Sequence, residues 1–301
     1  DKRGGLVGSE MCIRDRFYEP ESFTWSYLLA DPDSGKAAII DPVWVYNQVS
    51  GLADTSFTDE ILDYAEKNGW SIEWVLETHA HADHLSSAIH IREKTGARVG
   101  IGKGICAVQE TFVRVYHLDN VATDGSQFDH LFKDGDVIAL GELEIRVMET
   151  PGHTSDSVTY ICGDAAFIGD TLFAPGFGTA RCDFPGGDAA LLFDSIARIH
   201  SLPANTRLHL CHDYPAKGEE PTSVVRVSDS LANNIHASAG TSREAYIEMR
   251  TTRDAQLSLP KLIYPAIQVN IREGAAPEME SNGATYLKMP FNVDLGSLLK
   301  D

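Results

Sequence analysis

The feature that most constrains this chain is an apolar segment that runs directly into a cluster of histidines. Residues 71–78 read SIEWVLET, the pattern of a buried β-strand, and His79, His81, Asp83 and His84 follow it. Imidazole and carboxylate groups at this density attract cations, and the spacing H-x-H-x-D-H is a strong metal-binding signal. The fold must therefore contain a rigid strand whose end presents these side chains to a metal ion.

Other residues of metal-binding type also stand where an apolar strand ends. His153 follows the predicted strand 143–150, Asp170 ends the segment AAFIGD, and His212 lies near the end of RLHLCHD. Ligands on loops at strand ends, supported by a rigid sheet, are a common way to build a site. We therefore expect these three residues to join the histidine cluster. The remaining histidines, His90, His117, His130, His200, His209 and His236, are interpreted as packing or surface residues.

The order of the predicted elements favours a layered α/β fold. Hairpins interrupt the alternation of strands and helices, which excludes a doubly wound parallel sheet and favours a sandwich of mixed sheets with helices outside. A helix is expected over 58–69 with Thr58 as its N-cap, and another over 83–94. The segment 259–274, LPKLIYPAIQVNIREG, is expected to be extended.

The composition of the chain limits which partners it can bind and in which cellular compartment it is expected. The formal net charge of −19 argues against nucleic acid, because phosphate binding needs a basic surface. We find no run that approaches the roughly 18–20 apolar residues of a membrane helix. There are five cysteines and no C-x-x-C pair, which favours a reducing, cytoplasmic location.

The sequence divides into a central catalytic domain and two terminal segments. Residues 6–16, LVGSEMCIRDR, resemble translated adaptor sequence from sequencing libraries, so residues 1–16 are interpreted as an artefact outside the fold. Residues 17–222 are expected to form a catalytic domain, and residues 223–301 an extension that packs on it. The role of residues 260–274 is open between covering the site and pairing with a second subunit.

Four motifs together resemble the metallo-β-lactamase superfamily: H-x-H-x-D-H, T-P-G-H-T, G-D-T-L-F and C-H-D-Y. The resemblance implies an αββα sandwich, with two mixed sheets flanked by helices. It also implies two metal sites: one of His79, His81 and His153, and a second of Asp83, His84 and His212, with Asp170 bridging them. Such dinuclear sites bind a hydroxide and use it for hydrolysis.

The segment GTARCDFPGGDAALLFDSI, residues 178–196, resembles the persulfide dioxygenase branch of this superfamily, which is related to glyoxalase II. The matching residues are Arg181, Asp183, Phe184 and Gly187. That branch implies one Fe(II) held by His79, His153 and Asp170, the ligand set of non-haem oxygenases. It also implies that His81, Asp83, His84 and His212 position these ligands.

The same resemblance implies the substrate and its contacts. A thiol persulfide, typically glutathione persulfide, would react with O₂ to give sulfite and the parent thiol. Arg181 is the candidate substrate anchor, because a guanidinium binds carboxylates in bidentate fashion. Tyr214 is a candidate donor to substrate or oxygen, and Asp83 joins it as a candidate catalytic residue. Family members are often dimers, so a homodimer is possible.

Two alternatives stay open at this stage. All the ligands of a dinuclear hydrolase are present, so two Zn(II) ions, or a mixed Zn/Fe pair, and thioester hydrolysis of the glyoxalase II type fit the same residues. The helical glutathione-binding domain of glyoxalase II has no counterpart here. A non-enzymatic metal-binding regulatory module is a third, weaker reading. Cys182 and Cys211 are interpreted as structural thiols rather than redox groups.

Overall fold

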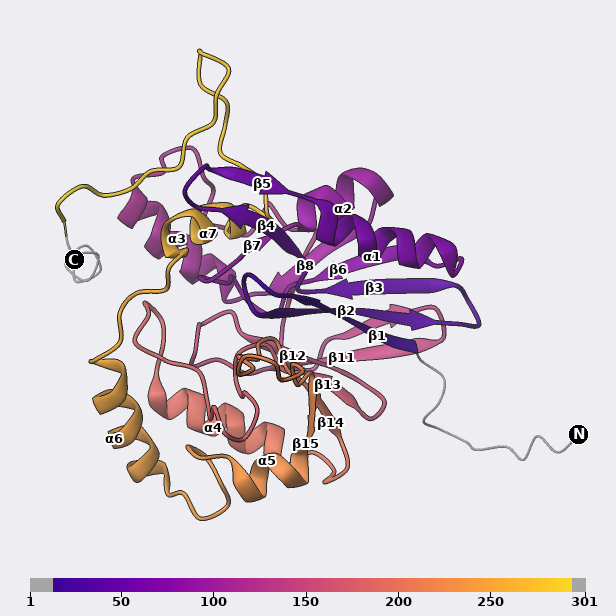
Figure 1. Ribbon diagram of the computed structural model, residues 1–301, viewed down its shortest axis with the longest axis vertical. Helices are drawn as coiled ribbons and strands as arrows, with labels where there is room; N and C mark the ends of the chain where they lie inside the picture. Colours follow the sequence, from indigo (N-terminus) through magenta and orange to yellow (C-terminus); the bar gives the residue numbers. More distant parts are fainter. Residues whose placement is uncertain (1–12, 294–301) are drawn as a thin grey trace, which may run out of the picture.

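Two mixed six-stranded sheets pack face to face in the computed structural model, which describes residues 13–293 (Figure 1). The first sheet has the order β1 (Ile13–Glu19), β2 (Thr24–Asp31), β3 (Lys36–Ile40), β6 (Ser71–Leu76), β8 (Arg98–Gly102) and β9 (His130–Phe132). The second has the order β10 (Val137–Leu140), β11 (Leu143–Glu149), β12 (Val158–Cys162), β13 (Ala165–Phe167), β14 (Arg207–His209) and β15 (Val224–Arg226). A small third sheet joins β5 (Leu52–Asp54), β4 (Val43–Asn47) and β7 (Leu85–Ser86).

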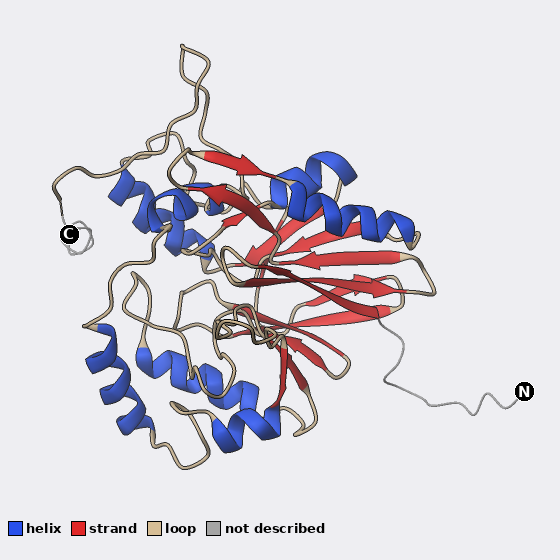
Figure 2. Cartoon of the chain, in the orientation of Figure 1, coloured by secondary structure: helices blue, strands red, loops and turns tan. Residues whose placement is uncertain are grey.

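Helices cover the outer faces of this sandwich (Figure 2). On the first sheet lie α1 (Ser56–Lys67), α2 (Ala88–Thr95) and α3 (Ile105–Tyr116). On the second lie α4 (Ala189–His200), α5 (Val227–Asn233) and α6 (Arg243–Asp254), while α7 (Ile263–Asn270) packs against β7 and α3. The predicted sandwich of mixed sheets with flanking helices is confirmed. Among the described residues, we find no helix long and apolar enough to span a bilayer.

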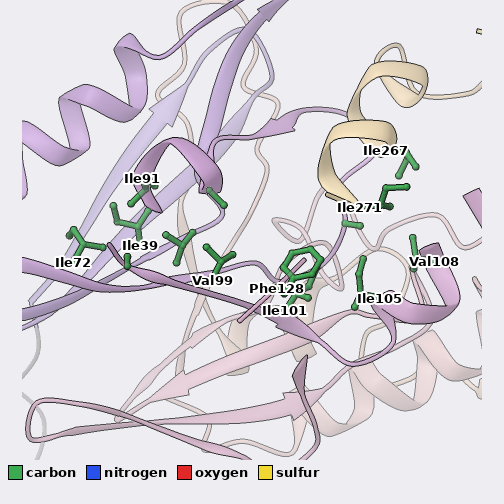
Figure 3. Close-up of a cluster of buried hydrophobic side chains, with 14 of the residues drawn as sticks. Ile39, Ile72, Ile91, Val99, Ile101, Ile105, Val108, Phe128, Ile267 and Ile271 are labelled. Carbon is green, nitrogen blue, oxygen red and sulfur yellow. The ribbon is translucent and has the colours of Figure 1, made fainter. Parts of the chain in front are cut away.

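The central strands are apolar on both faces because each face meets a different core. In β2, Leu28 packs beneath the helices, whereas Tyr27 and Leu29 point between the two sheets. This alternation explains why the strand reads as one continuous apolar run, as strands buried on both sides do. Figure 3 shows the outer core, where Ile39 and Ile101 of the first sheet meet helix residues.

The C-terminal segment belongs to this core, contrary to the extended conformation expected for 259–274. Residues 263–270 form α7, whose Ile267 packs with Ile105 and Val108 of α3 (Figure 3). Pro265 is tolerated because it lies in the first helical turn, where its missing N–H has no intrahelical partner to lose. The helix is apolar nearly all round, so its sequence lacks the one-sided pattern that marks a surface helix.

Two predicted helix starts are also wrong. Helix α1 begins at Ser56, and Thr58 is buried inside its first turn, where its hydroxyl donates to Val43 O at 2.9 Å. Helix α2 begins at Ala88 rather than near residue 83, because Leu85 and the residue after it pair with β4 as strand β7. In both cases, residues that the local sequence pattern places at a helix start instead form contacts with a distant strand, β4.

The first described strand begins before Phe17, the residue at which the sequence places the start of the fold. Strand β1 includes residues 13–16, and Ile13 lies opposite Ala30 of β2. The guanidinium of Arg16 donates to Ser223 Oγ at 2.6 Å. The view that these four residues stand outside the fold is therefore wrong, whereas residues 1–12, Cys12 included, lie outside the described residues. The adaptor origin of the segment stays a prediction.

Candidate metal centre

The predicted ligands converge at one edge of the sandwich, as their positions at strand ends require. The loop from β6 to β7 brings His79, His81, Asp83 and His84; the turns after β11, β13 and β14 bring His153, Asp170 and His212. Asp170 lies at the centre, with Oδ2 3.7 Å from His79 Nε2 and 3.8 Å from His153 Nε2. Its Oδ1 lies 3.4 Å from His212 Nε2, which is 3.2 Å from Asp83 Oδ2.

Hydrogen bonds fix which nitrogen of each imidazole faces the cluster. His153 Nδ1 lies 2.7 Å from Arg181 O, and a carbonyl only accepts, so this nitrogen carries the hydrogen. Thr78 Oγ1 donates to Asp41 Oδ2 at 2.9 Å and therefore accepts from His79 Nδ1 at 3.0 Å. In both rings Nε2 is left with a lone pair directed at Asp170, the form a metal ion requires.

His81 and His212 are oriented in the same way by other partners. His81 Nε2 lies 3.2 Å from Asp41 Oδ1, which leaves its Nδ1 for the cluster. His212 Nδ1 lies 3.3 Å from both Phe23 O and Thr24 Oγ1, which leaves its Nε2. Asp41 was not among the predicted site residues, although it ends the apolar segment KAAIID just as the other site residues follow theirs.

Unpartnered buried atoms in this cluster fit a metal ion. Within residues 13–293, the buried ligand atoms without a hydrogen-bond partner are His79 Nε2, His81 Nδ1, both ring nitrogens of His84, Asp170 Oδ1 and His212 Nε2. Leaving so many buried polar atoms unsatisfied is costly, and coordination to a cation would satisfy them. The cluster is therefore able to bind metal.

The protonation states of the histidines and carboxylates in the cluster also favour metal binding. Burial, together with the neighbouring imidazoles, holds the pKa of His79 and of His84 well below the usual value, so both rings are neutral. Burial opposes ionisation of Asp83, but the neighbouring His212 lowers its pKa to about 2. His81 differs, because Asp41 raises its pKa to about 9 against the effect of burial. A metal bound to His81 would therefore displace a proton.

A cavity of about 660 Å³ opens from the cluster. Asp83, His84, His153 and Asp170 line its inner end. Aromatic side chains form much of its wall: Phe23, Trp44, Tyr46, Phe173, Phe177, Phe184 and Tyr214. A partly apolar cavity with a few converging polar groups is the usual form of a small-molecule site.

The two predicted substrate residues both line this cavity. Arg181 donates to Asp183 through Nε at 2.6 Å and through Nη2 at 2.7 Å, and its Nη1 donates to Ser258 O at 2.6 Å. Three of its five N–H groups are thus used within the chain, and two stay available. The ring of Tyr214 stacks on that of His212 with centroids 6.2 Å apart, and burial raises the pKa of its hydroxyl, which therefore keeps its proton.

A second residue that sequence reasoning missed supports the cluster from behind. Asn270 of α7 donates from Nδ2 to His81 O and His84 O, each at 2.8 Å, and its Oδ1 accepts from Ser86 N at 2.8 Å. This contact joins residues 186 positions apart in the case of His84, so no local pattern marks it. The end of α7 therefore fixes the backbone of the loop between β6 and β7, which carries His79, His81, Asp83 and His84.

The two cysteines near the site have unreactive thiols. Cys182 Sγ donates to Asp254 Oδ2 at 3.4 Å, and burial together with that carboxylate raises its pKa to about 12. Cys211 Sγ lies 3.7 Å from Asp41 Oδ2, and burial raises its pKa well above the usual value. Both observations favour the structural role expected for these thiols.

Comparisons with known proteins agree with the fold. A model of the metallo-β-lactamase superfamily matches residues 20–212. The chain is 47% identical over 281 residues to a β-lactamase hydrolase-like protein of Agrobacterium fabrum, covering 93% of this chain and 65% of that protein. It is 43% identical over 279 residues to glyoxylase B2 of Dictyostelium discoideum, covering 92% and 96%. The crystal structure of ETHE1 from Myxococcus xanthus matches with a TM-score of 0.70 and 31% identity, covering 87% of this chain and all of that one.

The chain belongs to the metallo-β-lactamase superfamily. Within that superfamily it is similar both to ETHE1 and to proteins named for glyoxalase activity. It spans slightly less than two thirds of the Agrobacterium relative, 65% of its length.

Glycine at position 169 is needed for the position of His79. Its φ is +53°, and a Cβ there would lie 2.7 Å from Thr78 Oγ1, the atom that orients the His79 ring. We expect Gly169→Ala to cost about 1–3 kcal/mol in unfolding free energy, and to weaken metal binding about 10- to 100-fold. Urea denaturation and metal titration measure the two effects.

Gly163→Ala is the matched control. Its φ is +58°, but nothing lies within 4 Å of the added Cβ. It should therefore show the backbone strain of the left-handed region without the change in metal affinity. Equal metal affinities in the two variants would exclude the proposed contact with Thr78.

Proposed function

We propose that this protein is a persulfide dioxygenase that oxidises a low-molecular-weight thiol persulfide, with glutathione persulfide as the first candidate. The observation that supports this most is the geometry of His79, His153 and Asp170, in which one carboxylate oxygen lies 3.7 and 3.8 Å from two imidazole nitrogens. Two histidines and one carboxylate form the ligand set of non-haem Fe(II) oxygenases. Fe(II) bound there would supply open coordination positions and the redox chemistry that O₂ requires.

The residues of the chain have separate tasks in this proposal. The aromatic wall of the cavity excludes water from the reacting sulfur. Tyr214, which keeps its proton, donates a hydrogen bond to the substrate or to oxygen beside the cluster. Arg181 uses its two remaining N–H groups to orient the substrate, while Asp183 fixes the plane of its guanidinium.

The reaction balances with water as the third reactant. One persulfide, one O₂ and one water give one thiol, one sulfite dianion and two protons. The S–S bond breaks, the terminal sulfur loses four electrons and O₂ gains them. The inner sulfur leaves as the thiol.

Similarity over the C-terminal part of the chain supports the same proposal. ETHE1, a persulfide dioxygenase, matches 87% of this chain, a share larger than residues 20–212 alone. The cavity wall includes Arg253, Pro260 and Leu262 from this C-terminal part. The segment therefore shapes the substrate site rather than standing apart from it.

A dinuclear hydrolase is the second candidate, and a specific observation favours it. Asp83, Asp170 and His212 form a further group of ligand atoms, and His84 has no hydrogen-bond partner on either nitrogen within residues 13–293. A second metal ion would use these atoms and, with the first, would activate hydroxide for thioester hydrolysis. The relative named glyoxylase B2 is in keeping with this alternative.

Oxygen uptake separates the two functions. Anaerobically purified, Fe(II)-loaded protein is given glutathione persulfide, and O₂ consumption and sulfite are measured together. The proposal expects sulfite equal to the O₂ consumed. Absence of uptake, combined with thioester hydrolysis after two equivalents of Zn(II), would instead establish the hydrolase.

A further inference from the structure

The cavity wall formed by the C-terminal segment is fixed in place from two sides. The linker between α6 and α7, residues 255–262, receives a hydrogen bond from Arg181 Nη1 to Ser258 O at 2.6 Å. Gln48, in the β4–β5 turn, donates from Nε2 to Lys261 O at 3.1 Å. In Figure 1 this linker runs along one side of the molecule from α6, in the lower half, to α7 in the upper half. Side chains on it therefore have a defined position relative to the cavity.

Two positive charges on this wall are uncompensated. Of the basic residues that line the cavity, Arg181 is paired with Asp183, and Arg250 of α6 with Asp254. Arg253 and Lys261 line the same cavity, are exposed, and form no ion pair within the part of the chain described here. They stand out in a chain whose net charge is −19. The carboxylates that line the cavity are Glu19, Glu21, Asp83 and Asp170.

A neutral donor lines the same cavity as these two cations. His236 Nδ1 accepts from Thr179 N at 3.0 Å, so the hydrogen of the ring is on Nε2. No partner for that N–H is found within residues 13–293, and His236 lines the cavity. Gly178 leaves room for the ring, because a Cβ at that position would lie 2.0 Å from His236 Nδ1. His236 was predicted to be a packing or surface residue, whereas the structure places it on the cavity wall.

We propose that Arg253 and Lys261, with the Nε2–H of His236, form a second subsite that binds anionic groups of the substrate remote from its sulfur. This inference rests on the proposed function only in placing the sulfur at the metal cluster. Carboxylates and phosphates both satisfy such donors. The substrate class is therefore a thiol derivative with an anionic tail, rather than a simple alkyl persulfide or inorganic sulfide.

Binding of unreactive analogues tests the subsite without turnover. S-Methylglutathione carries carboxylates, and coenzyme A carries phosphates; their dissociation constants are measured by calorimetry. For the double variant Arg253→Ala/Lys261→Ala we expect affinity to fall on the order of tenfold for the preferred tail, and less at high salt. His236→Leu should weaken the same ligand by a smaller factor. The control, Lys67→Ala/Arg114→Ala, changes the net charge equally at exposed positions outside the cavity.

The outcomes discriminate between the tails and between the two proposals. Loss of affinity for one analogue alone identifies a carboxylate or a phosphate subsite, and loss for both indicates a general anion site. Equal affinities in the double variant and the control overturn the subsite. In turnover, the preference for glutathione persulfide over the uncharged hydroxyethyl persulfide should fall on the order of tenfold in the double variant. If wild-type protein oxidises no persulfide while analogue binding still depends on Arg253 and Lys261, the subsite stands and the proposed function fails.

Discussion

Asp170→Ala will abolish stoichiometric metal binding. Both oxygens of Asp170 face imidazole nitrogens: Oδ2 faces those of His79 and His153, and Oδ1 faces that of His212. Each ion of a one-metal or a two-metal site would therefore lose a ligand. His79→Ala and His153→Ala should have the same effect, because the three residues form the set proposed to hold iron. The metal content of purified protein, measured by mass spectrometry of the elements, gives the result directly.

His84→Ala discriminates between one ion and two. If one Fe(II) is held by His79, His153 and Asp170, this variant retains iron and loses activity only in part. If His84 binds a second ion, the variant loses about half of the metal that the wild type contains. The control is His90→Ala, since His90 lies on α2 and pairs with Asp59 at 2.8 Å, away from the cluster. A His84→Ala protein as empty as Asp170→Ala would contradict the mononuclear proposal.

The clustering of these side chains was predictable from the sequence because they share a local pattern. Each candidate ligand follows an apolar strand. Because the strands of a sheet lie side by side, residues that follow their ends come close together at the edge of the sheet. The apolar strand β6 and the histidine that follows it, His79, can be recognised in the sequence without knowing which strands pair with β6. His153, Asp170 and His212 carry the same signal at the ends of β11, β13 and β14.

The supporting contacts were not predictable, because they depend on tertiary structure. Asn270 reaches the backbone of His81 and His84 only because α7 folds back against β7. Apart from Gln268 and Asn270, the sequence of α7 is apolar, so its periodicity does not distinguish a helix from a strand. The same limitation applies to His236, whose position depends on the space left by Gly178. Packing between distant segments decides such details.

A large loss of stability is expected for Asp254→Ala, a substitution outside the metal-binding cluster. Asp254 is 3% exposed and accepts from Arg250 Nε at 2.9 Å and from Cys182 N at 2.8 Å. Arg250 is 2% exposed and also donates to Thr179 O at 3.0 Å. The substitution leaves the guanidinium charge buried with no counter-ion, which costs about 3–5 kcal/mol. Urea denaturation should show this as a lower midpoint.

The matched comparison is Asp194→Ala. Asp194 of α4 also binds an arginine of α6 through both oxygens, at 3.0 and 3.1 Å from Arg243 Nε and Nη2. That pair is exposed to water, which screens both charges, so its loss should change the midpoint far less. Equal losses in the two variants would mean that the burial of Arg250 does not determine the cost. A selective loss in Asp254→Ala would show that the buried Arg250–Asp254 pair of α6 stabilises the contact of this helix with Thr179 and Cys182, on either side of Arg181. The same contact positions the cavity wall that carries Arg253.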